Sequence, residues 1–151
     1  MSCTIRPARA EDAADVAALF LATRKACMPY AAMAHEDDGV RHWVRKVLVP
    51  AGGVSVLSDR EQALGFVASS LQNGEAWIDQ LYVQSGLLRR GTGSRLLLHA
   101  LKQLPRPVHL HCFQANVGAR AFYERHGFQA VAFSDGAANE ERCPDVRYVL
   151  T

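Results

Sequence analysis

The chain of 151 residues has the length of one domain, enough to bury a full core without disulfides or metal ions. Hydrophobic residues make up 49% of it and charged residues 21%, as in ordinary globular proteins. The net charge of +2 is too small, and the arginines are too scattered, to predict nucleic acid as a partner. We therefore expect one domain over residues 1–151.

The cysteines have neither the spacing of a zinc site nor that of a disulfide framework. They are Cys3, Cys27, Cys112 and Cys143. No apolar run approaches the roughly 20 residues of a membrane span, and the N-terminus has no apolar signal segment. These patterns predict reduced thiols in a cytoplasmic protein, with no metal and no membrane as partner.

The first 50 residues predict one strand followed by two helices. The strand covers residues 3–6. Apolar residues at helical spacing from Val16 to Cys27 predict the first helix. The second helix is predicted to begin near Glu36 or Asp37. Its buried stripe is predicted to consist of Val40, Trp43, Val44, Val47 and Leu48.

Three strands are predicted next. Those at 54–57 and 63–68 flank a polar, turn-like segment and predict a hairpin. The pair Asn73-Gly74 marks a second tight turn, and a third antiparallel strand follows it at 76–83.

The second half of the chain alternates helices with strands. Its predicted elements are a helix at 93–104, a strand at 108–113, a helix at 119–126, and strands at 128–133 and 146–150. The complete order is β-α-α-β-β-β-α-β-α-β-β, which predicts a mixed sheet with helices on its faces.

A glycine-rich turn opens the third predicted helix. Gly91 and Gly93 lack side chains, so a ligand can approach the backbone closely. Unpaired amides and the helix dipole at such a start favour a phosphate. Ser94 can add a hydroxyl, and Arg89 and Arg90 can add positive charge. Taken alone, the same pattern also fits a plain turn before a helix.

Two other nucleotide motifs fit this turn less well. A dinucleotide fingerprint needs a third glycine where Leu96 stands, and an acidic residue about 20 positions further on, where His111 to Phe113 stand. A P-loop needs Gly-Lys-Ser/Thr, which the turn lacks. A nucleotide-dependent oxidoreductase therefore stays an alternative class that these residues argue against.

One strand later comes a second motif, Asn116-x-x-Ala119-x-x-Phe122-Tyr123-x-x-x-Gly127-Phe128. Helix caps and core packing account for each of its residues separately. Together with the turn Leu88-Arg-Arg-Gly-Thr-Gly-Ser94, however, it resembles the two cofactor-side motifs of the GNAT superfamily of N-acetyltransferases.

This resemblance runs from Ile5 to Leu150. It implies an α/β (α+β) fold with a mixed, mostly antiparallel sheet of six or seven strands and helices on both faces. It also implies direct transfer of an acetyl group from acetyl-CoA (coenzyme A) to a primary amine of a small molecule or peptide. Homodimers are frequent in the superfamily. A CoA-binding regulatory protein without turnover stays open, because Leu88 stands where the family has Gln or Arg.

The resemblance places the cofactor contacts on three segments. Main-chain atoms of the strand before the turn polarise the thioester, and the turn holds the diphosphate. The second motif, with the helix predicted at 119–126, lines the pantetheine arm. The implied residues are Leu81, Tyr82, Val83, Leu88, Arg89, Arg90, Gly91, Thr92, Gly93, Ser94, Asn116, Ala119, Phe122 and Tyr123.

Two catalytic roles follow. Tyr123 is the predicted acid for the departing thiolate, because a phenol is protonated at neutral pH. Asp79 is the predicted base, with Glu75 and His111 as open alternatives. Alternation along the strand predicts that Glu75, Asp79 and Leu81 share one face.

The acceptor pocket of the superfamily is built by the first two helices and the final strands. By resemblance, the acceptor contacts here are Tyr30 and His35 near the front, and Asn139 and Glu140 in the polar loop before the last strand. An acidic loop can attract a cationic amine, although such loops are often simply solvated. Cys112 is the thiol nearest the site in sequence, and we predict a buried structural role for it.

Overall fold

The computed structural model describes residues 3–27, 36–87 and 91–151. Its strands are β1 (Cys3–Pro7), β2 (Val54–Asp59), β3 (Gln62–Gln72), β4 (Glu75–Val83), β5 (Val108–Phe113), β6 (Gln129–Ser134) and β7 (Asp145–Leu150). Its helices are α1 (Ala13–Cys27), α2 (Asp37–Trp43), α3 (Thr92–Gln103) and α4 (Val117–Arg125). Short helical turns are η1 (Ala10–Asp12), η2 (Val44–Leu48) and η3 (Ser85–Leu87). The order of strands and main helices is the predicted one.

The strands form one sheet in the order β1-β2-β3-β4-β5-β7-β6. Only β4 and β5 pair in parallel within it, and every other pair is antiparallel. The predicted mixed, mostly antiparallel sheet is therefore confirmed. In the described parts of the chain, no helix has the length and apolarity needed to cross a membrane.

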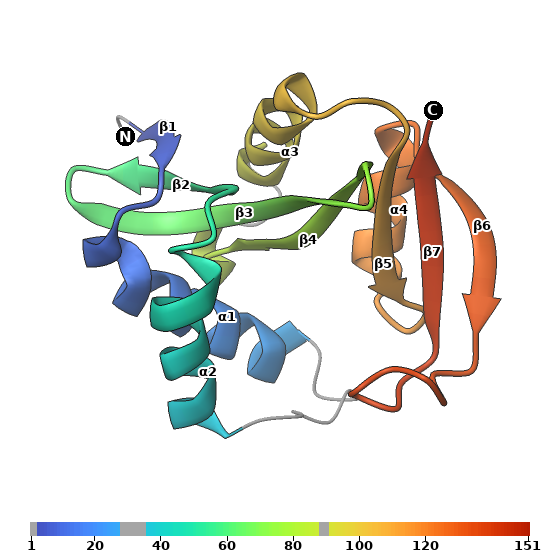
Figure 1. Cartoon of the computed structure of the whole chain (residues 1–151), viewed down its shortest axis with the longest axis horizontal. Coiled ribbons are helices and arrows are strands. Elements are labelled where there is room, and N and C mark those ends of the chain that lie inside the picture. Colours follow the sequence, from blue (N-terminus) through green and yellow to red (C-terminus); the bar gives the residue numbers. More distant parts are fainter. Residues whose placement is uncertain (1–2, 28–35, 88–90) are drawn as a thin grey trace.

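Each face of the sheet carries its own core. Helix α3 covers one face, where Leu96 and Leu110 are almost fully buried. Helices α1 and α2 cover the opposite face, where Val16 and Phe66 are fully buried (Figure 1). Burying one such side chain stabilises the fold by about 1.5–3 kcal/mol. Because helices cover both faces, residues at the helix ends can approach the edge of a strand from either face of the sheet.

The second predicted helix differs from expectation in its last turn. After Trp43 the chain continues as the π-helical turn η2, closed by a bond from the Val49 amide to the Val44 carbonyl at 3.0 Å. The wider turn rotates the following residues away from their α-helical positions. Val40 and Val44 are buried as predicted, but Val47 is 54% exposed, so its placement in the buried stripe is wrong.

A β-bulge in β4 decides the geometry of the site. Ala68 pairs with Gln80 and Ser69 pairs with Ile78, so Asp79 is an extra residue without a partner on β3. A bulge reverses the alternation of faces. Ile78 and Leu81 therefore face the same core, and the prediction that Glu75, Asp79 and Leu81 share one face is wrong.

The pairing of β4 with β5 ends at the same place. It covers only Ala76 to Ile78 on β4, opposite Val108 to Leu110 on β5. Beyond that point β4 stays with β3, and β5 stays with β7. The sheet is therefore split between β4 and β5, and Figure 1 shows the two strands diverging.

Candidate active site

A cleft of about 720 Å³ opens beside the split. Most of its walls come from three segments: the end of β4, the start of α3 and the inner side of α4. It brings together ten of the predicted cofactor contacts, namely Leu81, Tyr82, Val83, Gly91, Gly93, Ser94, Asn116, Ala119, Phe122 and Tyr123. The volume lies in the range of small-molecule sites.

At the start of α3, which lines this cleft, the first amides have no hydrogen-bond acceptor among the described residues. Gly91 is the N-cap with φ +76°, a conformation that favours glycine. The first intrahelical bond runs from the Arg95 amide to the Gly91 carbonyl at 3.1 Å, so the amides of Thr92, Gly93 and Ser94 have no helical acceptor. The first turn carries no acidic side chain to neutralise the dipole. This end of α3 is therefore an electropositive wall.

The start of α4 forms the facing wall. The Asn116 side-chain oxygen accepts a hydrogen bond from the Ala119 amide at 3.2 Å, as expected of an N-cap. The Tyr123 ring packs edge-on against Phe122 and Phe128, with ring centroids 5.2 and 5.7 Å away. These contacts hold the Tyr123 ring in one orientation.

The phenol of Tyr123 is kept neutral. Burial raises its pKa well above the usual range, and the nearby Cys112 and Tyr82 raise it further. The ring is half-buried in the cleft wall, and no partner for its hydroxyl lies among the described residues. Tyr123 therefore carries a proton that it can donate.

Cys112, on β5, is a buried thiol as predicted. It is 8% exposed, and its Sγ lies 3.6 Å from the carbonyl oxygen of Phe113. Burial raises the pKa of the Cys112 thiol to about 12, although the Arg120 charge opposes the shift. Almost none of it is thiolate at neutral pH, and only the thiolate is a strong nucleophile.

Asp79 stands at the bulge, where β4 and β5 part. Its side chain is exposed by surface area, yet loss of water around it raises the pKa of the carboxyl above its ordinary value. A hydrogen bond with Ser70 partly opposes this shift. Asp79 does not line the cleft itself but lies at the fork that begins it.

The two alternative bases, Glu75 and His111, belong to a cluster on β4 and β5 that also contains Trp77 and His109. The Trp77 ring stacks against both His109 and His111, with ring centroids 5.0 and 5.1 Å away. Glu75 lies 3.5 Å from His109 Nε2, and Asp145 lies 3.8 Å from His111 Nδ1. Glu75 is at the closed end of the strand pair, whereas His111 lies just beyond the last paired residue. Of the two, His111 is nearer the fork.

Several predicted contacts are not part of the described cleft. Tyr30, His35, Leu88, Arg89 and Arg90 lie outside the described residues. Thr92 is buried within the start of α3.

The predicted contacts Asn139 and Glu140 lie in the loop at 135–144. The Asn139 amide donates to the Cys143 carbonyl at 2.7 Å and accepts from the Cys143 amide at 3.1 Å. Its polar atoms therefore hold the loop together. Glu140 is exposed on the same loop.

Five lining residues were missed by sequence reasoning. They are Thr23, Leu87, Gly118, Ala121 and Arg125. The spacing of Gly118, Ala121 and Arg125 places them on one side of a helix, and this signal could have found them. Thr23 comes from α1, and nothing local in the sequence marks it.

Comparison with known proteins agrees with this geometry. A model of the acetyltransferase (GNAT) family matches residues 18–128, which is more than half of the chain. The apo form of YjaB from Escherichia coli has a similar structure, with 22% identity, a TM-score of 0.79, and coverage of 100% of this chain and 99% of that chain.

Two further solved structures contain ligands. PaiA N-acetyltransferase from Thermoplasma acidophilum, in complex with coenzyme A, has 16% identity and a TM-score of 0.76, covering 100% of this chain and 99% of that chain. Naa50 from Arabidopsis thaliana, in complex with the bisubstrate analogue CoA-Ac-MVNAL, has 17% identity and a TM-score of 0.73, with the same coverage. At these identities the likeness shows the fold. From the family match, the chain belongs to the GNAT family of acetyltransferases and is an acyltransferase.

Proposed function

We propose that the protein transfers an acetyl group from acetyl-CoA directly to a primary amine. The observation that carries this proposal is the cleft itself. It places the free amides at the start of α3 and the neutral phenol of Tyr123 on facing walls of one cavity, beside a strand that has lost its neighbour. The relatives PaiA and Naa50 hold coenzyme A and a CoA–peptide analogue, which supports the same ligand here.

The residues present fit coenzyme A. A Cβ at Gly91 would have no atom of the described residues outside its immediate neighbours within 4 Å, so this part of the helix start leaves room for a bulky diphosphate. Arg125 adds positive charge at the cleft wall. Beyond Ile78, no described residue pairs with β4 on its β5 side, so its backbone can pair with an extended arm as if with an added strand. Acetyl-CoA, when bound, supplies an acyl carbon open to attack and a sulfur leaving group.

Tyr123 acts as the acid in this proposal. Transfer to an amine expels a thiolate. The ordinary pKa of the corresponding thiol lies below that of a phenol. With the pKa of Tyr123 raised by burial, its proton is present at any physiological pH. The phenol donates this proton, or a hydrogen bond, to the departing sulfur.

Asp79 acts as the base. An ammonium group must lose a proton before it can attack, and a carboxylate with a raised pKa accepts that proton more readily than an ordinary one. Because Asp79 stands at the fork and outside the cleft lining, it acts through a water molecule. His111, with Asp145 3.8 Å away, is the alternative base from the neighbouring strand.

A thiol-release assay with acetyl-CoA and a panel of amines tests the proposal. We expect acetyl-CoA to protect the protein from thermal unfolding and at least one amine to release CoA. Protection without release on any amine would favour a CoA-binding regulatory protein. Protection by NAD but not by acetyl-CoA would contradict the proposal and favour the oxidoreductase class.

A further inference from the structure

Arg24, near the end of α1, is a buried cation that the proposed transfer does not use. Its side chain is 7% exposed, and its guanidinium lies over the rings of Phe20 and Phe113, 5.6 and 5.3 Å from their centroids. Its Nε is buried and has no hydrogen-bond partner among the described residues. A buried ion costs several kcal/mol unless a partner compensates it.

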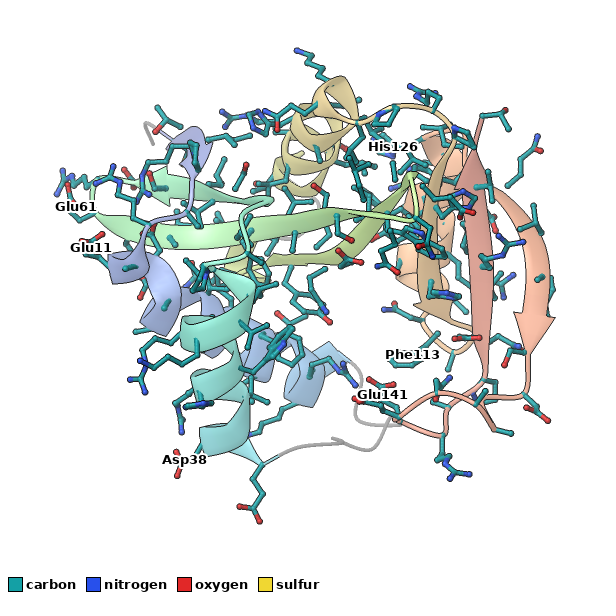
Figure 2. All side chains as sticks on the ribbon, in the orientation of Figure 1. Glu11, Asp38, Glu61, Phe113, His126 and Glu141 are labelled. Carbon is teal, nitrogen blue, oxygen red and sulfur yellow. The ribbon has the colours of Figure 1, made fainter. Side chains whose placement is uncertain are left out.

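The carboxylate that faces Arg24 is a weak partner. Glu141 Oε1 lies 3.5 Å from Arg24 Nη2, at the long limit of a hydrogen bond. Figure 2 shows Glu141 on the loop at 135–144 and Phe113 at the end of β5, both toward the end of α1. An arginine can bind a carboxylate through two parallel bonds, so this guanidinium has unused capacity for an anion.

The place of this cation relative to the cleft is given by Tyr82 and Thr23. Thr23, the residue before Arg24, lines the cleft, and so does Tyr82. Burial raises the pKa of Tyr82, and the adjacent Arg24 charge opposes that shift. Tyr82 in turn contributes to the raised pKa of the Tyr123 phenol. Arg24 itself does not line the cleft, but it directly follows Thr23 in the chain and lies beside Tyr82, and both of these residues do.

The cation also lies on the face of the sheet opposite the diphosphate wall. Arg24 belongs to α1, which covers one face, whereas the free amides belong to α3 on the other. A group bound at Arg24 thus approaches the split from the side away from α3. In the proposed transfer, an acceptor amine reaches the thioester from that side, because the opposite side is taken by the diphosphate and α3.

We propose that Arg24 binds the carboxylate of the acceptor, and that the acceptor is a free amino acid or a close derivative with its amine a few atoms from its carboxylate. This inference rests on the proposed acetyl transfer. Glu141 occupies part of the guanidinium in the free protein and gives way to the acceptor carboxylate. Both rings that flank Arg24 exclude water, which strengthens the charged pair.

Paired acceptors test the inference. Each amino acid in a panel is compared with its carboxamide, which keeps the amine and removes the charge. We expect kcat/KM to favour the amino acid by about 30-fold, as for the loss of one charged, buried hydrogen-bonding contact. A second readout needs no turnover: with CoA present, N-acetyl amino acids should raise the unfolding temperature more than N-acetyl amino amides do.

Two variants, each with a matched control, locate the effect. Arg24→Met keeps most of the apolar packing and should bring the preference ratio close to one. Arg45→Met removes an exposed cation of η2 and should leave the ratio unchanged. Glu141→Gln removes the competing carboxylate and should lower KM for the amino acid but not for its amide. Glu61→Gln, in the distant β2–β3 turn, is its matched control (Figure 2).

The outcomes separate this inference from the proposed function. A protein that neither binds acetyl-CoA nor releases CoA refutes both. Turnover with equal preference for acid and amide, or a preference that persists in a folded Arg24→Met variant, overturns the carboxylate site alone. If Arg24→Met fails to fold, Arg24→Lys and Glu141→Gln decide, since an unchanged ratio in both also overturns it. If neither an amino acid nor an N-acetyl amino acid binds, the carboxylate site is likewise overturned.

Discussion

The two sides of the cleft are built in different ways. The cofactor side, as we propose it, uses main-chain groups: the amides that open α3 and the β4 backbone beyond the bulge. The acceptor side, as we infer it, uses side chains, with Arg24 held between Phe20 and Phe113 and facing Glu141. A backbone site depends on a few glycines and caps, whereas a side-chain site depends on residues brought together from across the fold. The cofactor side should therefore be general to the family, and the acceptor side particular to this chain.

The largest expected effect concerns the phenol between the two sides. Tyr123→Phe keeps the ring contacts with Phe122 and Phe128 but removes the proton. We expect kcat to fall by roughly 10²–10⁴-fold, with little change in the dissociation constant of acetyl-CoA. Tyr82→Phe is the contrast, because its hydroxyl interacts with Arg24. That variant should change mainly the acceptor KM. Steady-state kinetics with both variants checks this, and an unchanged kcat in Tyr123→Phe would remove it as the acid.

The bulge carboxylate should give the next largest effect. Asp79→Asn should lower kcat/KM by roughly 100-fold. The base works deprotonated, and burial raises its pKa, so wild-type activity should fall with decreasing pH at a higher pH than for an ordinary aspartate. The acidic limb of the pH–rate profile should disappear in Asp79→Asn. If it disappears in His111→Gln instead, the histidine beside Asp145 is the base.

A side chain at the start of α3 tests the backbone-built side. A Cβ at Gly93 would lie 3.5 Å from the Phe122 ring, an ordinary contact, so the fold should accept Gly93→Ala while the cleft narrows. We expect the dissociation constant of CoA to rise by about 30-fold, or about 2 kcal/mol. Calorimetry measures the CoA affinity of the variant, and its unfolding temperature shows whether the fold is kept. Undiminished CoA affinity in the folded variant would show that the diphosphate binds elsewhere.

The loop at 135–144 tests the side-chain-built side. Gly136 has φ +84°, and a Cβ there would lie 2.3 Å from the Cys143 carbonyl carbon. Gly136→Ala should lower the free energy of unfolding by about 1–3 kcal/mol and weaken acceptor binding more than CoA binding. Gly52→Ala is the control, since Gly52 has φ +80° but an added carbon there would have no atom of the described residues outside its immediate neighbours within 4 Å. If Gly136→Ala and Gly52→Ala are equally destabilised, the cause is the positive φ alone and not the contact of Gly136 with Cys143.

The smallest effect is expected at Cys112. Direct transfer needs no enzyme thiol, and with a pKa of about 12 this thiol is almost fully protonated at neutral pH. Cys112→Ala should therefore leave kcat within about twofold of the wild-type value. Loss of turnover in a variant that still binds CoA, together with an acetylated thiol in the wild type by mass spectrometry, would contradict direct transfer.

Local sequence patterns were sufficient to predict the residues of the proposed cofactor side. An N-cap such as Asn116 and a left-handed glycine such as Gly91 satisfy needs that arise within one turn of chain. The alternation of strand and helix periods likewise predicted the order of elements. The interpretation failed at Val47, because a π-turn is closed by a bond that no short pattern announces.

The amino-acid sequence by itself determined the order of elements, the free amides at the start of α3 and the family of the chain. Only the tertiary structure decided the bulge at Asp79, because a bulge is defined by the register against β3 and not by the residues of β4 alone. The same holds for Arg24 and Glu141, which lie 117 positions apart in the chain and meet only when the two halves of the split sheet fold together. Caps and glycine turns act over a few residues, whereas registers and buried charges depend on partners that are distant in sequence.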